Sequence, residues 1–125
     1  MHIRESLLLT ALILAACSPD ESGKEVSWSA LNMERLQLEL IDDQKYELYS
    51  FGKEGTVSAT IGLRNGPLMA PLFYWRVEGD HLIISENPQS MTVADLYEPR
   101  KGGDVLFVKR GLGGRSKFRI TKRDA

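Results

Sequence analysis

The chain has 125 residues, a formal net charge of −1 and a single cysteine. One cysteine excludes an intrachain disulfide, so the fold must be stabilised by packing alone. The length that follows the apolar opening segment predicts one domain.

The chain opens with an apolar segment, Ser6–Ala16, that carries no charged residue. A helix of this length spans only roughly 17 Å, whereas the core of a bilayer requires about 20 apolar residues. The segment also lacks the polar face of a surface helix. With Arg4 before it and the small Ala15 and Ala16 at its end, it is typical of a secretory signal peptide, residues 1–16.

The segment Leu14-Ala15-Ala16-Cys17 resembles the lipobox of bacterial lipoproteins, and it holds the only cysteine directly after the apolar run. The resemblance implies cleavage before Cys17, diacylation of the Cys17 sulfur and acylation of the new amine. Two or three acyl chains anchor a protein stably, whereas a single chain binds a membrane only marginally. An ordinary signal peptide with a chance cysteine and an uncleaved anchor are the alternatives.

In that family the residue after the cysteine sorts the product, and Ser18 in place of Asp implies the outer membrane of a Gram-negative cell. We therefore expect a lipid-anchored protein that faces the periplasm, a compartment that excludes nucleic acid as a partner. Residues 17–27 are polar and are expected to form a lipidated, flexible tether of roughly 15–20 Å. Residues 28–125 are expected to form the folded domain.

Beyond Trp28 the sequence consists of short apolar segments of period two, separated by turn signals. Leu36, Leu38 and Leu40, for example, alternate with polar residues. We expect about eight antiparallel strands, at residues 35–41, 45–51, 56–62, 72–78, 81–86, 91–97, 104–110 and 115–122. Such a meander predicts an all-β domain, either a small barrel or a sandwich.

Two hairpins are specified in detail. In the first, a turn at Gly79-Asp80 places Val77 opposite Leu82 and Trp75 opposite Ile84, on an inner face that also includes Phe73. In the second, a four-residue loop places Phe107 opposite Phe118 and Val105 opposite Ile120. The other face of this second hairpin then mixes apolar and basic side chains and is a candidate interaction surface: Leu106, Val108, Lys117 and Arg119.

The sequential meander around the first hairpin, Tyr74–Ile84, resembles the lipocalin-like, calycin-type small lipoproteins. The resemblance covers shape more than motif, because the Gly-x-Trp signature of lipocalins is absent: Val26 stands two residues before Trp28. It implies a barrel whose cavity is small or filled by side chains, since the strands are short. No functional residue is transferred from that family.

Catalytic and metal-binding motifs are not recognisable. His81 is the only histidine of the domain, so a metal site would lack converging ligands, and we expect an exposed turn residue. Asp42-Asp43 does not follow the spacing of a calcium loop, and the segment 111–114 lacks the ending of a phosphate-binding loop. We therefore expect no enzyme, no metal and no cofactor.

Charge is divided unevenly along the chain. Residues 100–125 include nine Lys or Arg and two Asp, a net charge of +7, whereas residues 17–99 carry a net charge of −8. The basic segment either forms a face for anionic headgroups or an acidic partner, or pairs internally. In a closed meander the last strand lies beside the first, so Lys117 and Arg119 would then meet Glu34 and Glu39.

A predicted loop, Arg64–Phe73, contains the apolar residues Leu68 and Met69 between two prolines. These residues either plug one end of the barrel or form the mouth of a binding site, with Tyr74 and Trp75 nearby. The function we expect is the binding of a small apolar or amphipathic envelope ligand. The alternative is a protein–protein interaction module, such as an accessory subunit or an inhibitor of an envelope enzyme.

Overall fold

The computed structural model describes residues 23–89, 92–112 and 114–122. Its strands are β1 (Lys24–Glu25), β2 (Leu36–Leu40), β3 (Lys45–Phe51), β4 (Thr56–Leu63), β5 (Leu68–Met69), β6 (Leu72–Glu78), β7 (His81–Ser85), β8 (Thr92–Gly102), β9 (Val105–Arg110) and β10 (Gly114–Lys122). Three short 3₁₀ helices complete it: η1 (Trp28–Leu31), η2 (Met33–Arg35) and η3 (Lys53–Gly55). No helix in these residues is long and apolar enough to cross a membrane.

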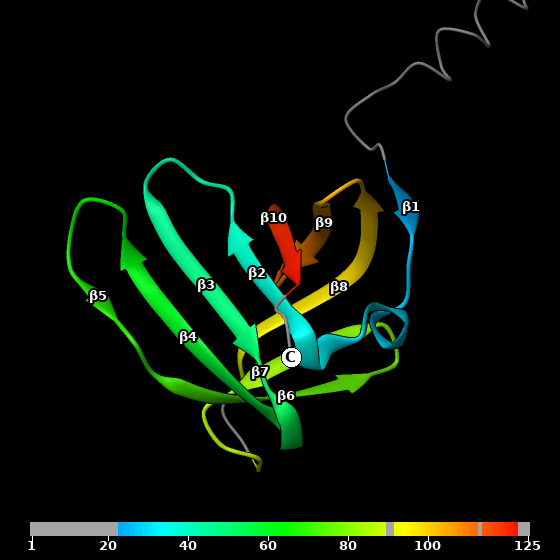
Figure 1. Cartoon of the computed structure of the whole chain (residues 1–125), viewed down its shortest axis with the longest axis horizontal. Coiled ribbons are helices and arrows are strands. Elements are labelled where there is room, and N and C mark those ends of the chain that lie inside the picture. Colours follow the sequence, from blue (N-terminus) through cyan, green and yellow to red (C-terminus); the bar gives the residue numbers. More distant parts are fainter. Residues whose placement is uncertain (1–22, 90–91, 113, 123–125) are drawn as a thin grey trace, which may run out of the picture.

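Eight of the strands close an antiparallel barrel in chain order (Figure 1). Each barrel strand pairs with the one that follows it in the order β2, β3, β4, β6, β7, β8, β9 and β10. The last strand, β10, pairs back with β2 and closes the barrel. The two remaining strands are additions, with β1 on β8 and β5 on β4. The prediction of an all-β meander is confirmed, and closure makes it a barrel and not a sandwich.

The barrel interior is filled by the alternate, inward-facing residues of its strands. The interior side chains that are at most 3% exposed include both aromatic and aliphatic residues: Leu36, Leu38, Tyr49, Phe51, Val57, Ala59, Leu82, Ile84, Leu96, Leu106, Val108 and Phe118. Trp28, on η1, joins the same cluster at 0% exposure. The strand alternation read from the sequence therefore marks the residues that pack the core.

The register predicted for the first hairpin is confirmed. Val77 lies opposite Leu82 and Trp75 opposite Ile84, across the turn at Gly79-Asp80. Gly79 has a φ of 62°, which a two-residue hairpin turn favours and which glycine adopts without strain. The inner face packs into the core as expected.

The register predicted for the second hairpin is wrong by one residue. Gly114 pairs with Arg110, so the loop has three residues, and Phe118 lies opposite Leu106 instead of Phe107. A slip of one residue exchanges the two faces of a strand. Leu106 and Val108 consequently point into the core, at 0% and 2% exposure.

The interaction surface predicted on this hairpin therefore does not exist as one face. Lys117 lies opposite Phe107, and Arg119 lies opposite Val105, on the outer side of the barrel. Leu106 and Val108 are on the inner side, so the four residues are divided between the two faces.

The predicted tether, 17–27, contains a paired strand. Lys24 and Glu25 pair with β8, and the Arg100 Nη2 donates a hydrogen bond of 3.0 Å to the Gly23 carbonyl. The backbone from residue 24 on is thus held against the barrel. The predicted signal peptide, the lipobox with Cys17 and the rest of the tether up to residue 22 lie outside the described residues.

β8 is longer than predicted, because it continues through a proline. The pairing with β9 shifts register between Tyr97 and Arg100, and Glu98 takes a left-handed φ of 51°. Such an irregularity lets a strand absorb Pro99, whose missing N–H would otherwise leave a gap in the ladder. The N–H of Val26, the residue that follows β1, donates a 3.2 Å hydrogen bond to the Pro99 carbonyl.

The two ends of the barrel differ. At one end, called here the plugged end, lie β1, η1 and the turns 52–55, 79–80 and 103–104. Trp28 closes this end, and its Nε1–H donates a 2.8 Å hydrogen bond to the Asp80 carbonyl. At the other, called here the distal end, lie the connections β2–β3, β4–β5–β6, β7–β8 and β9–β10. The two ends approach each other on one side of the barrel, where Glu54 and Gly55 line the same surface hollow as Ser85 and Pro88.

Candidate functional site

Exposed apolar side chains gather at the distal end. Seven large hydrophobic residues of the described chain are exposed, and all seven lie in or beside the connections of this end: Ile41, Leu63, Leu68, Met69, Leu72, Val93 and Leu112. We call this set the apolar rim. Single exposed hydrophobic residues are ordinary on a protein surface, whereas a set of them in one group of connections is a candidate contact surface.

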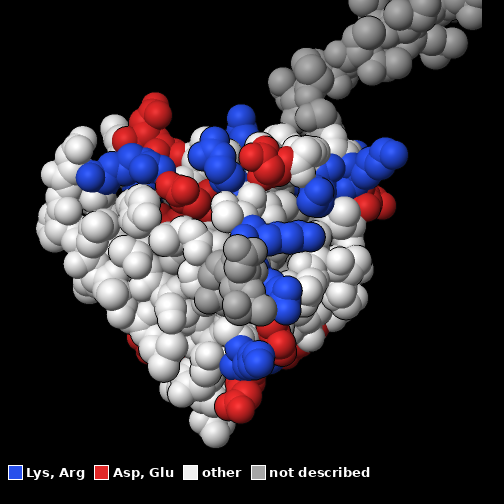
Figure 2. All heavy atoms as spheres, in the orientation of Figure 1, with Lys and Arg blue, Asp and Glu red and all other residues white. Residues whose placement is uncertain are grey.

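Four members of the apolar rim lie on β4, β5 and β6, which are neighbours in the sheet. Leu68 and Met69 are 51% and 64% exposed, and Leu63 and Leu72 flank them at 52% and 57%. Figure 2 shows that the flank of the molecule at β4 and β5, on its left side, is largely without charged side chains below the upper edge. Leu68 and Leu72 share one face of the β5–β6 segment, and Met69, opposite Ile61, lies on the other face.

A glycine holds β5 against β4. Gly62 lies opposite Leu68 with a φ of 154°, and a Cβ at this position would lie 2.2 Å from the Pro67 carbonyl oxygen. No side chain larger than a hydrogen fits in that space, so the close approach of β5 depends on Gly62. The position of Leu68 and Met69 is therefore specified by the local backbone.

The four residues predicted to bind a ligand separate into two pairs. Leu68 and Met69 lie on β5, whereas Tyr74 and Trp75 line a surface hollow of about 240 Å³ farther along β6. Trp75 is fixed there by a 3.2 Å hydrogen bond from its Nε1–H to the Gly52 carbonyl and by an edge contact with Phe51. The hollow is smaller than the 300–1,000 Å³ of common ligand pockets.

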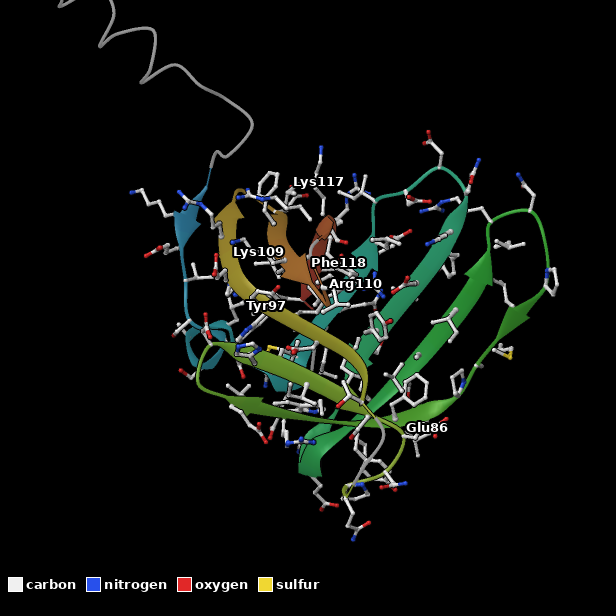
Figure 3. The ribbon with its side chains drawn as sticks, turned by 180° about the vertical axis from the view of Figure 1, so that it is seen from behind. Glu86, Tyr97, Lys109, Arg110, Lys117 and Phe118 are labelled. Atoms are coloured by element: carbon white, nitrogen blue, oxygen red, sulfur yellow. The ribbon has the colours of Figure 1, made fainter. Side chains whose placement is uncertain are left out.

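A charged network crosses the barrel interior. Arg110 on β9 donates a 2.6 Å hydrogen bond from its Nη2 to Glu47 Oε1 on β3, and the Tyr49 hydroxyl donates to the same oxygen at 2.8 Å. Figure 3 shows Arg110 in the middle of the barrel, between β9 and β3. The network ties two strands that are not neighbours in the sheet.

Burial and charge set the protonation of this network. Burial raises the pKa of the Tyr49 hydroxyl, and the negative charge of Glu47 raises it further. Burial acts to lower the pKa of Arg110, but the hydrogen bond and the charge of Glu47 outweigh it and raise that pKa above its ordinary value. Arg110 is therefore charged and Tyr49 is neutral at any physiological pH.

His81 is fixed on the outer side of the barrel. Its Nδ1 lies 2.8 Å from Asp95 Oδ1, and its ring stacks on Tyr97 with centroids 5.0 Å apart. The hydrogen bond to Asp95 raises the pKa of His81 above its ordinary value of 6.5. The sequence predicted an exposed turn residue, whereas His81 is half-buried and begins β7. A second carboxylate, from Asp80, lies 3.5 Å from the His81 Nε2.

Replacing His81 with glutamine is expected to reduce stability at acid pH and to have little effect at alkaline pH. The folded-state pKa is raised, so the protonated ring stabilises the fold below pH 6.5, and this contribution is lost as pH rises through the folded-state pKa. Urea unfolding of both proteins at about pH 5.5 and pH 8.5 measures the difference. An equal loss at both values would contradict the assignment, and Asp95→Asn should reproduce the same pH dependence.

The basic C-terminal segment contributes Lys109, Arg115, Lys117 and Arg119 to the outer side of β9 and β10. Arg119 lies opposite Glu39, as predicted for the seam between β10 and β2, but the ion pair of Glu39 is with Arg64, at 3.9 Å. Figure 2 shows Lys and Arg side chains interspersed with Asp and Glu on the face in view. The position of the seam is confirmed, whereas no ion pair joins Arg119 to Glu39.

Sequence reasoning found two members of the apolar rim and missed the rest. Leu68 and Met69 were conspicuous because they lie between prolines, but Ile41, Val93 and Leu112 are single apolar residues in or beside turns. Within the described ranges, no three His, Cys, Asp or Glu residues group to hold a metal. No protein-family model, no curated protein and no solved structure matches this chain.

Proposed function

We propose that the protein is a lipid-anchored, non-catalytic module of the bacterial cell envelope that binds a partner protein through its apolar rim. The observation that carries this proposal is the gathering of the exposed large hydrophobic side chains at the distal end, combined with an interior that is filled by side chains. Removing such apolar surface from water is favourable, so its burial by a partner protein would contribute to binding.

The location of β1 supports a partner that lies away from the anchoring membrane. β1 pairs with β8 at the plugged end, opposite the apolar rim. With Cys17 as the lipid attachment, only the five residues 18–22 separate it from Gly23. The plugged end would then face the bilayer, and the rim would face the periplasm.

A second copy of the chain is a less favourable partner for the rim than a different protein. Two copies joined rim to rim would carry their β1 strands at opposite ends, so their lipids could not enter the same bilayer. This geometry favours a different protein over a second copy of the chain.

A second candidate function is the binding of a small ligand in the hollow beside Tyr74 and Trp75. The observation in its favour is an aromatic lining with a polar margin that includes Arg76 and Ser85. A volume of about 240 Å³ suits a fragment-sized molecule better than an acyl chain. The interior of the barrel is less favourable, because large side chains occupy it.

The double variant Met69→Asn with Leu112→Asn is expected to lose the partner. Both side chains are highly exposed, at 64% and 108%, so the substitutions should leave the fold intact. We expect an affinity loss of about tenfold or more, because the variant removes apolar contacts from both sides of the rim. The measurement is the native size of the full chain after mild detergent extraction from its own membranes.

The matched control is Lys53→Asn with Asp104→Asn, two exposed polar residues in turns of the plugged end. The wild type and this control should migrate as a complex with a second protein, and the rim variant should migrate alone. A wild-type chain that migrates alone, or a rim variant that keeps the partner, would overturn the proposal. An added mass of only a few hundred daltons would favour the second candidate.

A further inference from the structure

We propose that the partner contributes an extended strand, which adds to the outer edge of residues 68–72. This inference rests on the proposed function and specifies how the apolar rim is bound. It is argued from the backbone of the β5–β6 segment, whose polar groups alternate between two sides.

The inner side of this segment is paired with β4. The Leu63 N–H donates to the Pro67 carbonyl at 3.3 Å, and the Ala59 N–H donates to the Pro71 carbonyl at 3.0 Å. Because backbone groups alternate in direction along a strand, residues 67, 69 and 71 face β4. The N–H and C=O groups of Leu68, Ala70 and Leu72 consequently face the other way.

The two prolines of the segment leave that outer edge intact. Proteins commonly protect an exposed edge with a proline, which removes a donor from it. Pro67 and Pro71 occur at positions that face β4, so the N–H groups they lack are not on the outer side. Leu68, Ala70 and Leu72 each keep an outward donor and acceptor, spaced as a strand requires.

No strand of the described chain covers this edge. β5 pairs only with β4, and β6 joins β7 only from Tyr74 onward, opposite Ser85. In Figure 1, β5 forms the left border of the molecule. The other strands of the closed barrel pair with a neighbouring strand on each side. The outer edge of residues 68–72 can therefore pair with an added strand.

The side chains beside the edge indicate what the added strand carries. Leu68 and Leu72 are exposed, and Met69 lies opposite Ile61, toward the distal mouth of the barrel. Cross-strand neighbours stabilise a pair when both are apolar. We therefore expect an extended partner segment with apolar residues opposite Leu68 and Leu72.

The test is photocrosslinking of the full chain in cells of its own species, with benzoylphenylalanine placed at residue 68 or residue 72. A strand pairs residue by residue, so the two positions should crosslink to one partner segment at residues about four apart. Crosslinks to scattered segments, to another copy of this chain or to nothing would overturn strand addition.

The second arm is Ala70→Pro, with Ala70→Ser as its matched control. Proline removes the central outward N–H, and Ala70 already precedes Pro71, which restricts it to the extended conformation that proline tolerates. We expect Ala70→Pro to lower the crosslink yield at residue 72 about tenfold and Ala70→Ser to preserve it, with unchanged circular dichroism for both.

The two proposals fail in different ways. If Ala70→Pro keeps the crosslink while the Met69→Asn, Leu112→Asn variant loses the partner, strand addition is wrong and the rim still binds. If the rim variant also keeps the partner, the proposed function itself is wrong.

Discussion

Replacing Trp28 with alanine is expected to lower the free energy of unfolding by about 3–5 kcal/mol, the range measured for removal of a large core aromatic side chain. Trp28 is 0% exposed and closes the plugged end of the barrel. The substitution leaves a cavity between η1 and the core, and it removes the hydrogen bond to the Asp80 carbonyl. Because Asp80 belongs to a turn near the surface, water can replace that bond, and the cavity dominates the cost.

Urea unfolding monitored by circular dichroism measures this loss, provided that the transition is two-state for both proteins. Ser29→Ala is the matched control, since Ser29 is exposed on the same short helix and should change stability by less than about 0.5 kcal/mol. A loss below about 1 kcal/mol for Trp28→Ala would show that η1 does not seal the barrel.

Replacing Arg110 with alanine is the second large expected effect. Breaking a fully buried ion pair costs about 3–5 kcal/mol, and because the Arg110 and Glu47 side chains are 29% and 13% exposed, we expect about 2–3 kcal/mol. The variant leaves Glu47 in the barrel with only the Tyr49 hydroxyl as a donor. The cost therefore comes from an unpaired carboxylate more than from the lost attraction.

A double-mutant cycle separates these contributions. Arg110→Met combined with Glu47→Leu removes both charges and keeps apolar volume, so it should be more stable than either single variant. Urea unfolding of the four proteins gives the coupling energy. Additive losses would show that the two side chains do not interact in solution and would contradict the network in the barrel.

The strands could be predicted well because each has one buried face. In β2, the alternation of Leu36, Leu38 and Leu40 with polar residues reflects directly which side meets the core. The Gly79-Asp80 turn fixed the register of β6 and β7, since a two-residue loop leaves one pairing. The local sequence pattern therefore determined both the strands and the register of β6 with β7.

The second hairpin could not be predicted in the same way. Residues 105–108 are all apolar, so neither face of β9 is distinguished by hydrophobicity, and the loop contains several glycines. Gly111 adopts a left-handed φ of 57° and begins a loop of three residues. The correct register is stabilised by Phe118 entering the core beside Tyr49, a contact that sequence separation conceals.

The candidate site depends on closure of the barrel, which sequence patterns do not encode. Ile41 and Leu112 are distant in the chain and reach the same end only because the strands alternate in direction. The network of Arg110 and Glu47 also depends on closure of the barrel, because it joins β9 and β3 across the interior. Leu68 and Met69 could be found from sequence because prolines isolate them in a turn segment.

Methionine oxidation tests the central claim most directly, because the apolar rim contains Met69 and the core contains Met33. Brief oxidant exposure followed by mass spectrometry reports the access of each thioether to solvent. Met69 is 64% exposed and Met33 is 5% exposed, so of these two methionines Met69 should react rapidly in the isolated chain and Met33 should not. We predict that Met69 is protected in intact cells and becomes reactive after detergent extraction and purification, with Met33 protected throughout. Equal oxidation of Met69 in cells and in the isolated chain would show that nothing covers the rim.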